Sequence, residues 1–194
     1  MNLANKITLS RFVLTAIFVG FASSDSETHL WIAYFAGFTA CITDFFDGYI
    51  ARKYNLQTEF GALMDPLADK IFVAAAFIVM VEKQLVPAWV VIIILGRELA
   101  VTGLRLVAAQ GGKVIEAGAG GKVKAVIQFI CLGFIGLLWA MKMPLQITAA
   151  AHADPLMLGF KYFLYGSMYF TVAITVWTGY EYFAKNKHLY MENM

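Results

Sequence analysis

The sequence predicts an all-α integral membrane protein, a bundle of six transmembrane helices with a polar cavity that opens to the cytoplasm. The first observation is the composition, since 60% of the 194 residues are hydrophobic and 14% are charged, with a mean hydropathy of +0.69. A soluble domain has about 45–50% apolar and about 25% charged residues. The length suits a single domain over residues 1–194. A net charge of +2 gives no indication of a nucleic-acid partner.

The second observation is a series of apolar segments, each near the length of about 20 residues that a membrane-spanning helix needs. Charged or turn-forming residues separate these segments. The predicted helices cover residues 10–24, 29–50, 61–82, 86–108, 122–141 and 157–183. The break around residues 141–155 is only mildly apolar, and we expect it at the membrane interface.

The third observation is the distribution of lysine and arginine, which are enriched on the cytoplasmic side of membrane proteins. With the N-terminus inside, the cytoplasmic ends collect 12 of the 15, and only Lys83, Lys142 and Lys161 lie outside. This split predicts a multi-pass protein with both termini in the cytoplasm. Arg11 interrupts the first apolar stretch and no cleavage site follows it, so we expect a retained helix rather than a signal peptide.

Four of the six aspartates occur at the predicted cytoplasmic ends of the second and third helices. Asp44 and Asp47 are three residues apart and Asp65 and Asp69 are four apart, so each pair lies on one helix face. A short loop joins the two helices and makes them antiparallel neighbours. We therefore expect the four carboxylates to converge on one place.

Carboxylates brought this close repel one another unless a cation neutralises them. Mg²⁺ and Mn²⁺ suit oxygen ligands. Four carboxylates can hold two ions about 3.5–4 Å apart, an arrangement used for displacement at phosphorus. Gly48, Ala51 and Gly61 remove side-chain bulk beside the aspartates, which leaves room for a substrate group.

Two alternatives remain open for individual aspartates. Asp65 precedes Pro66, which is typical of a helix N-cap, and Asp47 with Arg52 would form a surface ion pair at a helix end. Neither alternative explains all four residues together, because an aspartate within a membrane span is costly and usually functional.

The spacing D-x2-D-G-x2-A-R-x8-G-x3-D-x3-D runs from Asp44 to Asp69 with every specified position present. This pattern resembles that of the CDP-alcohol phosphotransferases, integral membrane enzymes of phospholipid synthesis. The resemblance implies that an alcohol attacks the β-phosphorus of a CDP-linked donor, usually CDP-diacylglycerol, and that CMP leaves. It also implies six helices, a cytoplasmic site, a bacterial-type inner or plasma membrane, and a homodimer.

The resemblance also assigns roles to individual residues. Asp44, Asp47 and Asp65 would hold two Mg²⁺ or Mn²⁺ ions with Asp69 close to them, and Asp69 would take the proton of the acceptor hydroxyl as general base. The expected donor contacts are Gly48, Ala51 and Gly61 at the cytidine and Arg52 at the phosphates. Asn5, Thr8 and Arg11 near the cytoplasmic surface are expected either to contact the donor or to anchor the first helix at the interface.

A second polar cluster lies in the fourth apolar segment, where Arg97, Thr102 and Arg105 occur within GRELAVTGLRL. Ionisable residues within a membrane segment face a polar interior or a cavity, and the planar guanidinium binds two phosphate oxygens at once. Together with Lys122, these residues predict a pocket for a phosphorylated acceptor, and Lys124 lies nearby at the start of the next predicted helix. The alternative is that Arg97 pairs with a carboxylate such as Glu98 and that Arg105 extends to the interface.

Three segments favour one acceptor. NKITLSR at 5–11, MDPLADK at 64–70 and RELAVTGLR at 97–105 resemble the branch of the family that uses sn-glycerol 3-phosphate. Phosphatidylglycerol, inositol phosphate and serine remain alternative acceptors. A Mg²⁺ transporter and a structural membrane scaffold are alternatives of other classes. The transporter is disfavoured because the carboxylates lie on one side only, beside arginines that repel a passing cation.

Overall fold

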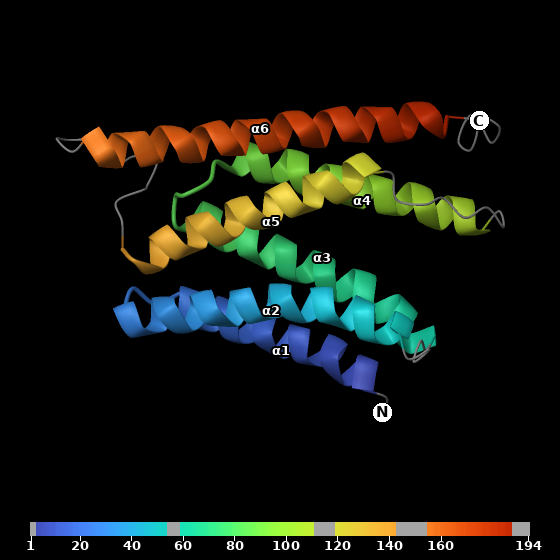
Figure 1. Ribbon diagram of the computed structural model, residues 1–194, viewed down its shortest axis with the longest axis horizontal. Helices are drawn as coiled ribbons and strands as arrows, with labels where there is room; N and C mark the ends of the chain where they lie inside the picture. The colour runs from blue at the N-terminus through green and yellow to red at the C-terminus, as the bar shows by residue number, and fades with distance from the viewer. Residues whose placement is uncertain (1–2, 54–58, 111–118, 143–154, 188–194) are drawn as a thin grey trace. The chain divides into compact units, whose positions relative to one another are not determined.

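The computed structural model describes residues 3–53, 59–110, 119–142 and 155–187, and within these ranges the chain forms six α-helices and no strand (Figure 1). The helices are α1 (Leu3–Ala22), α2 (Glu27–Lys53), α3 (Glu59–Glu82), α4 (Ala88–Gln110), α5 (Ala119–Ala140) and α6 (Pro155–Lys185). Side chains are described in these ranges except at residues 3–7, 44–53, 59–63, 65–66, 110, 119–120, 122 and 156–157. The prediction of an all-α chain with six helices is confirmed.

The predicted helix ends are wrong in places, most clearly at the N-terminus, where α1 begins at Leu3 rather than at residue 10. α2 likewise continues to Lys53, three residues past its predicted end at residue 50. Hydropathy locates the apolar part of a helix, whereas backbone hydrogen bonding continues through its polar turns. The added turns bring Asn5 and Thr8 into α1. The predicted interfacial segment falls mostly on residues 143–154, outside the described part.

One helical segment in the described part of the chain, Val123–Ala140, is long and apolar enough by itself to cross a membrane. Thr8–Ala22 is a shorter apolar stretch. Length and hydropathy alone do not identify the other helices as spans, since α4, for example, contains Arg97, Glu98 and Arg105. The arrangement of six membrane spans therefore stays a prediction.

The chain divides into two compact units, residues 1–86 with 132–149 and residues 87–131 with 150–194. In the first unit α1 packs against α2 and α3, and consecutive helices run in opposite directions (Figure 1). Phe18 of α1 meets Phe72 of α3 edge to face, with ring centroids 6.1 Å apart. Gly37 of α2 permits this approach, because a Cβ there would lie 3.3 Å from the ring of Phe18. The aspartate-bearing helices α2 and α3 are thus antiparallel neighbours, as predicted.

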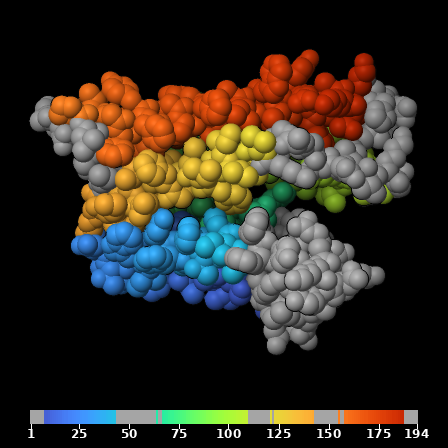
Figure 2. Space-filling model, viewed as in Figure 1, coloured from blue at the N-terminus to red at the C-terminus, as the bar shows by residue number. Residues whose placement is uncertain are grey.

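In the second unit α4 packs against α6, and the two helices run in the same direction (Figure 1). Leu104 and Ala108 of α4 are buried against Tyr182 and Phe183 of α6. Side chains of α6 are exposed along the described helix (Figure 2). The large exposed hydrophobic residues between 160 and 180 are Tyr162, Phe163, Tyr169, Phe170, Val176, Trp177 and Tyr180.

Candidate functional site

The predicted site residues fall in both units. The first unit carries Asn5, Thr8, Asp44, Asp47, Gly48, Ala51, Arg52, Gly61, Asp65 and Asp69, and the second carries Arg97, Thr102, Arg105 and Lys122. Nine of these side chains lie outside the described residues: Asn5, Asp44, Asp47, Gly48, Ala51, Arg52, Gly61, Asp65 and Lys122. Their positions on the helices are described, and their roles stay predictions.

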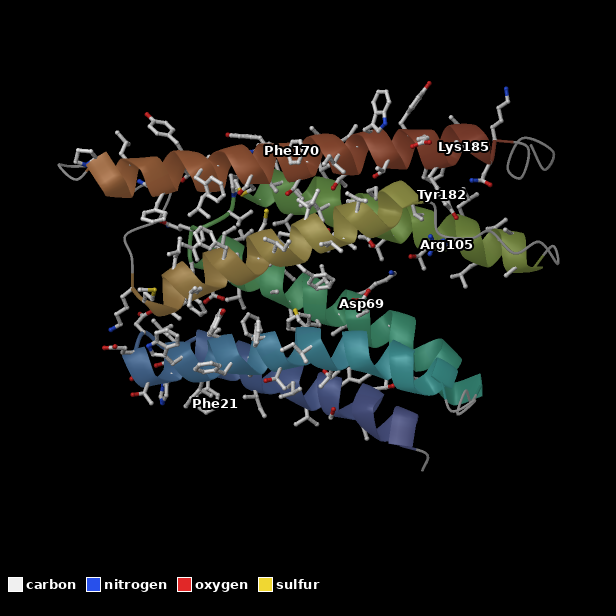
Figure 3. The ribbon with its side chains drawn as sticks, viewed as in Figure 1. Phe21, Asp69, Arg105, Phe170, Tyr182 and Lys185 are labelled. Carbon is white, nitrogen blue, oxygen red and sulfur yellow. The ribbon has the colours of Figure 1, made fainter. Side chains whose placement is uncertain are left out.

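The aspartates lie within unbroken helix, Asp44 and Asp47 on α2 and Asp65 and Asp69 on α3. Spacings of three and four residues therefore put each pair on one helix face. Asp69 is half-buried on α3 (Figure 3). Because carboxylates are the hard oxygen donors that Mg²⁺ and Mn²⁺ prefer, the chemistry of these residues fits such ions.

Among the described side chains, no group of three or more His, Cys, Asp or Glu residues could hold a metal ion. That set includes Asp69 but none of the other three predicted ligands. The prediction of a two-ion site is therefore not tested by these residues, and it rests on the helix positions and the donor chemistry.

Thr8 and Arg11 lie on the same helix as Asn5, and both are buried, with 1% of each residue exposed. The backbone carbonyl of Arg11 also accepts a hydrogen bond from the hydroxyl of Thr15 at 2.8 Å. A residue that anchors a helix at the membrane interface keeps its polar head in water. The burial of Arg11 and Thr8 instead favours a polar position inside the helix packing.

A buried ionic cluster forms in the second unit around Glu98 of α4. Its Oε1 accepts a hydrogen bond from Nζ of Lys124 at 2.5 Å and another from Nη1 of Arg97 at 3.2 Å. Lys124 is 2% exposed, and the side chains of Arg97 and Glu98 are 13% and 25% exposed. The alternative in which Arg97 pairs with Glu98 is thus observed. Among the described contacts, one carboxylate pairs with two cations.

Small residues surround the Arg97 side chain. A Cβ on Gly179 of α6 would lie 3.0 Å from Cγ of Arg97 and 3.8 Å from its Nε, and a Cβ on Gly121 of α5 would lie 3.9 Å from Nη2. Nε of Arg97 is buried and has no hydrogen-bond partner among the described residues. A buried charged donor without a hydrogen-bond partner is costly.

Arg105 contacts Tyr182 of α6, and this contact does not test whether Arg105 extends to the membrane interface. Arg105 donates its Nε–H to the hydroxyl of Tyr182 at 3.1 Å, and its Cζ lies 5.5 Å from the ring centroid (Figure 3). Thr102 between the two arginines donates its hydroxyl to the carbonyl of Glu98 at 2.8 Å. Its hydroxyl hydrogen is therefore committed to its own helix, although the oxygen can still accept a hydrogen bond.

Four residues around the arginines were not assigned a place in the acceptor site by the sequence analysis: Glu98, Lys124, Gly179 and Tyr182. Lys124 was grouped with Lys122 only as nearby positive charge, and Glu98 only as an alternative partner for Arg97. The charge of Glu98 and Lys124 within apolar segments is a signal that identifies such residues. Gly179 and Tyr182 carry no comparable signal in a helix rich in aromatic residues.

The family of the chain follows from comparison with known proteins. The model of the CDP-alcohol phosphatidyltransferase family matches residues 1–177. The chain belongs to this family, whose members are membrane-bound enzymes that transfer a phosphatidyl or related group.

Individual relatives extend over most of the chain. It is 41% identical, over 95% of each chain, to the CDP-diacylglycerol–glycerol-3-phosphate 3-phosphatidyltransferase of Bacillus subtilis. It is 31% identical to the protein of the same name from Haemophilus influenzae, over 100% of this chain and 97% of the relative. A protein of Mycobacterium tuberculosis named "Probable phosphatidylglycerophosphate synthase" is 43% identical over 76% of this chain and 71% of its own length.

Proposed function

We propose that the chain transfers the phosphatidyl group of CDP-diacylglycerol to sn-glycerol 3-phosphate, giving phosphatidylglycerophosphate and CMP. The observation that carries this proposal is the 41% identity, over 95% of each chain, to a relative named for that reaction. The family model covers residues 1–177 and so includes segments of both compact units. This extent supports one phosphatidyltransferase domain over residues 1–194.

The proposed enzyme is a multi-pass protein of a bacterial-type inner membrane, with both termini and the active site on the cytoplasmic side. The distribution of lysine and arginine supports this orientation. The exposed aromatic and aliphatic side chains of α6 support the membrane location, because a helix in contact with lipid exposes such residues. In this setting the acyl chains of the donor stay in lipid while its nucleotide reaches the cytoplasmic site.

The aspartates would hold the metal ions and perform the proton transfer. Asp44, Asp47, Asp65 and Asp69 are the proposed ligands of Mg²⁺ or Mn²⁺, and two bound ions would neutralise the diphosphate and stabilise the departing CMP oxygen. The acceptor oxygen bonds to the β-phosphorus as the bond from phosphorus to the CMP oxygen breaks. Asp69 accepts the proton of that hydroxyl as general base.

The remaining residues of the first unit would bind the donor. Gly48, Ala51 and Gly61 carry little or no side chain, so the backbone of α2 and α3 can approach the cytidine closely. Arg52 would contact the donor phosphates. Asn5 and Thr8 are assigned to the donor as well, which agrees with the burial of Thr8.

The acceptor phosphate is assigned to Arg97, Arg105, Thr102 and Lys122 of the second unit. The position of Arg97 and Arg105 on the same helix supports this assignment, since a guanidinium binds two phosphate oxygens at once. Serine has no phosphate for these arginines to bind. The proposal therefore favours a phosphorylated acceptor.

Purified protein given CDP-diacylglycerol, Mg²⁺ and one acceptor at a time tests the function. We expect CMP release and a phosphorylated lipid product with sn-glycerol 3-phosphate. If CMP is released with phosphatidylglycerol, inositol phosphate or serine but not with sn-glycerol 3-phosphate, that compound is the acceptor instead. Metal uptake into liposomes without CMP release with any acceptor would instead establish the transporter.

Cross-linking and mass measurement in detergent test the proposed homodimer, and a single monomeric species would contradict it.

A further inference from the structure

We infer that α6 positions the two arginines of the acceptor pocket, with Gly179 leaving space for Arg97 and Tyr182 holding Arg105. This inference rests on the proposed function, since it concerns the binding of a phosphorylated acceptor. All four residues belong to the second unit, where α4 packs against α6 (Figure 3). Gly179 and Tyr182 are positioning residues, because they act on the substrate through the arginines.

Gly179 determines where the stem of Arg97 can lie. A Cβ at this position would stand 3.0 Å from Cγ of Arg97, closer than carbon atoms normally approach. Relieving this contact requires Cγ, which is near the backbone of α4, to move by a few tenths of an ångström. Such a shift at the stem also displaces the guanidinium, whose Nη1 donates a hydrogen bond to Glu98 at 3.2 Å.

Tyr182 fixes the orientation of Arg105 in two ways. Its hydroxyl accepts the Nε–H of Arg105 at 3.1 Å, and its ring lies 5.5 Å from Cζ. The ring is held in turn by packing against Leu104 and Ala108. Because the Nε–H is directed at Tyr182, the guanidinium plane is fixed, and its terminal nitrogens carry the paired N–H groups that bind two phosphate oxygens.

Both positioning residues are neutral. A carboxylate in either place would pair with an arginine and cancel the charge that attracts a phosphate, whereas glycine and tyrosine constrain the side chains and leave their charge intact. Gly179 and Tyr182 are three residues apart, so one face of α6 serves Arg97 and Arg105, which are eight apart on α4. Nη1 of Arg97 is held by Glu98 at 3.2 Å.

The alternative is that Gly179 and Tyr182 serve helix packing alone, because small residues and aromatic rings commonly fill such contacts. Loss of packing lowers stability and impairs every kinetic constant together. Loss of positioning raises the KM for the phosphorylated acceptor while the KM for CDP-diacylglycerol is retained. The separation of the two KM values distinguishes these roles.

The test compares Gly179→Ala with Gly166→Ala on the same helix, where a Cβ would meet nothing within 4 Å. It also compares Tyr182→Phe and Tyr182→Leu with the same changes at Tyr180, which is 73% exposed. We expect the KM for sn-glycerol 3-phosphate to rise about tenfold in Tyr182→Phe, from loss of a hydrogen bond to a charged group. The KM for sn-glycerol 3-phosphate should rise further in Tyr182→Leu. In Gly179→Ala this KM should rise about tenfold or more, because small displacements of a positioned group have large effects.

An unchanged acceptor KM in folded Gly179→Ala and Tyr182→Phe would overturn the inference, as would an equal rise in both KM values. If Gly179→Ala does not fold, the Tyr182→Phe result decides alone. If the wild-type protein uses inositol phosphate instead, the proposal of sn-glycerol 3-phosphate as acceptor is wrong. The positioning is then tested by the KM of the same variants for inositol phosphate. If only an acceptor without a pocket-bound phosphate, such as serine, supports CMP release, both the acceptor and the inference are wrong.

Discussion

Lys124 of α5 donates a hydrogen bond to Oε1 of Glu98 on α4, 26 residues away in the sequence, with the lysine almost completely buried. Removing one partner of a buried ion pair leaves an uncompensated charge and destabilises a protein by roughly 3–5 kcal/mol. Glu98→Gln should therefore lower the midpoint of thermal unfolding in detergent markedly. Because the carboxylate is 25% exposed, the effect should lie at the lower end of that range.

Glu181→Gln is the matched control for that variant. Glu181 pairs with Lys185 one turn further along α6, but the two side chains are 46% and 71% exposed. An exposed pair of this kind contributes about 0.3–0.5 kcal/mol, so the control should change the midpoint little. Equal shifts in the two variants would show that the buried pair has no special role. Replacing both Glu98 and Lys124 by Gln and Met should restore part of the lost stability.

Arg97→Lys should raise the KM for sn-glycerol 3-phosphate although it keeps the charge. Lysine provides a compact ammonium in place of the planar fork that binds two phosphate oxygens. The loss of one charge-assisted hydrogen bond of about 1.5–3 kcal/mol corresponds to roughly tenfold or more in KM. Steady-state kinetics with each substrate varied in turn measures the effect. A rise confined to the KM for CDP-diacylglycerol would place Arg97 with the donor instead.

Asp69→Asn should abolish turnover while the fold is retained. Asparagine preserves the shape of the side chain but cannot accept the proton of the acceptor hydroxyl, and loss of a general base lowers kcat by about 10²–10⁴-fold. The control is Asp25→Asn, since Asp25 is 95% exposed and pairs with Lys83 at 3.0 Å. If Asp69→Asn retains full kcat, and with it the wild-type dependence of kcat on pH, the base is another residue.

Removal of divalent metal should stop CMP release, and adding back Mg²⁺ or Mn²⁺ should restore it. The direct measurement is Mn²⁺ binding followed by electron paramagnetic resonance, where we expect about two ions per chain for a paired-metal site. Asp44→Asn should weaken this binding, because a carboxylate ligand is replaced by a neutral amide. Unchanged Mn²⁺ binding in Asp44→Asn, with Asp25→Asn as control, would exclude Asp44 as a ligand.

The sequence was a good guide to the helices and to the charged residues, because hydropathy and helical spacing are local properties. Each predicted apolar segment is helical in the structure. Each aspartate pair lies on one helix face, because α2 and α3 are unbroken there. The ends of α1 and α2 were not predictable in the same way, since a polar turn such as the one around Asn5 gives no hydropathy signal.

The partners of the arginines depend on how helices pack, so they were less predictable. Arg105 and Tyr182 are 77 residues apart in the sequence. Their contact requires α4 and α6 to lie side by side in one register, which helical periodicity within a single segment does not specify. Gly179 became informative only once the course of the Arg97 side chain was known. A glycine in a transmembrane helix otherwise indicates close packing alone.

The proposed orientation is tested by the accessibility of single cysteines at Ser26 and Lys187, both exposed in the structure. In a protein whose native Cys41 and Cys131 are replaced by alanine, Ser26→Cys should react with a membrane-impermeant maleimide in intact cells. Lys187→Cys should react only after the membrane is opened, because lysine-rich ends stay in the cytoplasm. Labelling of both positions in intact cells, or of Lys187→Cys alone, would contradict a topology in which the C-terminus is cytoplasmic and the Ser26 turn lies on the other side of the membrane.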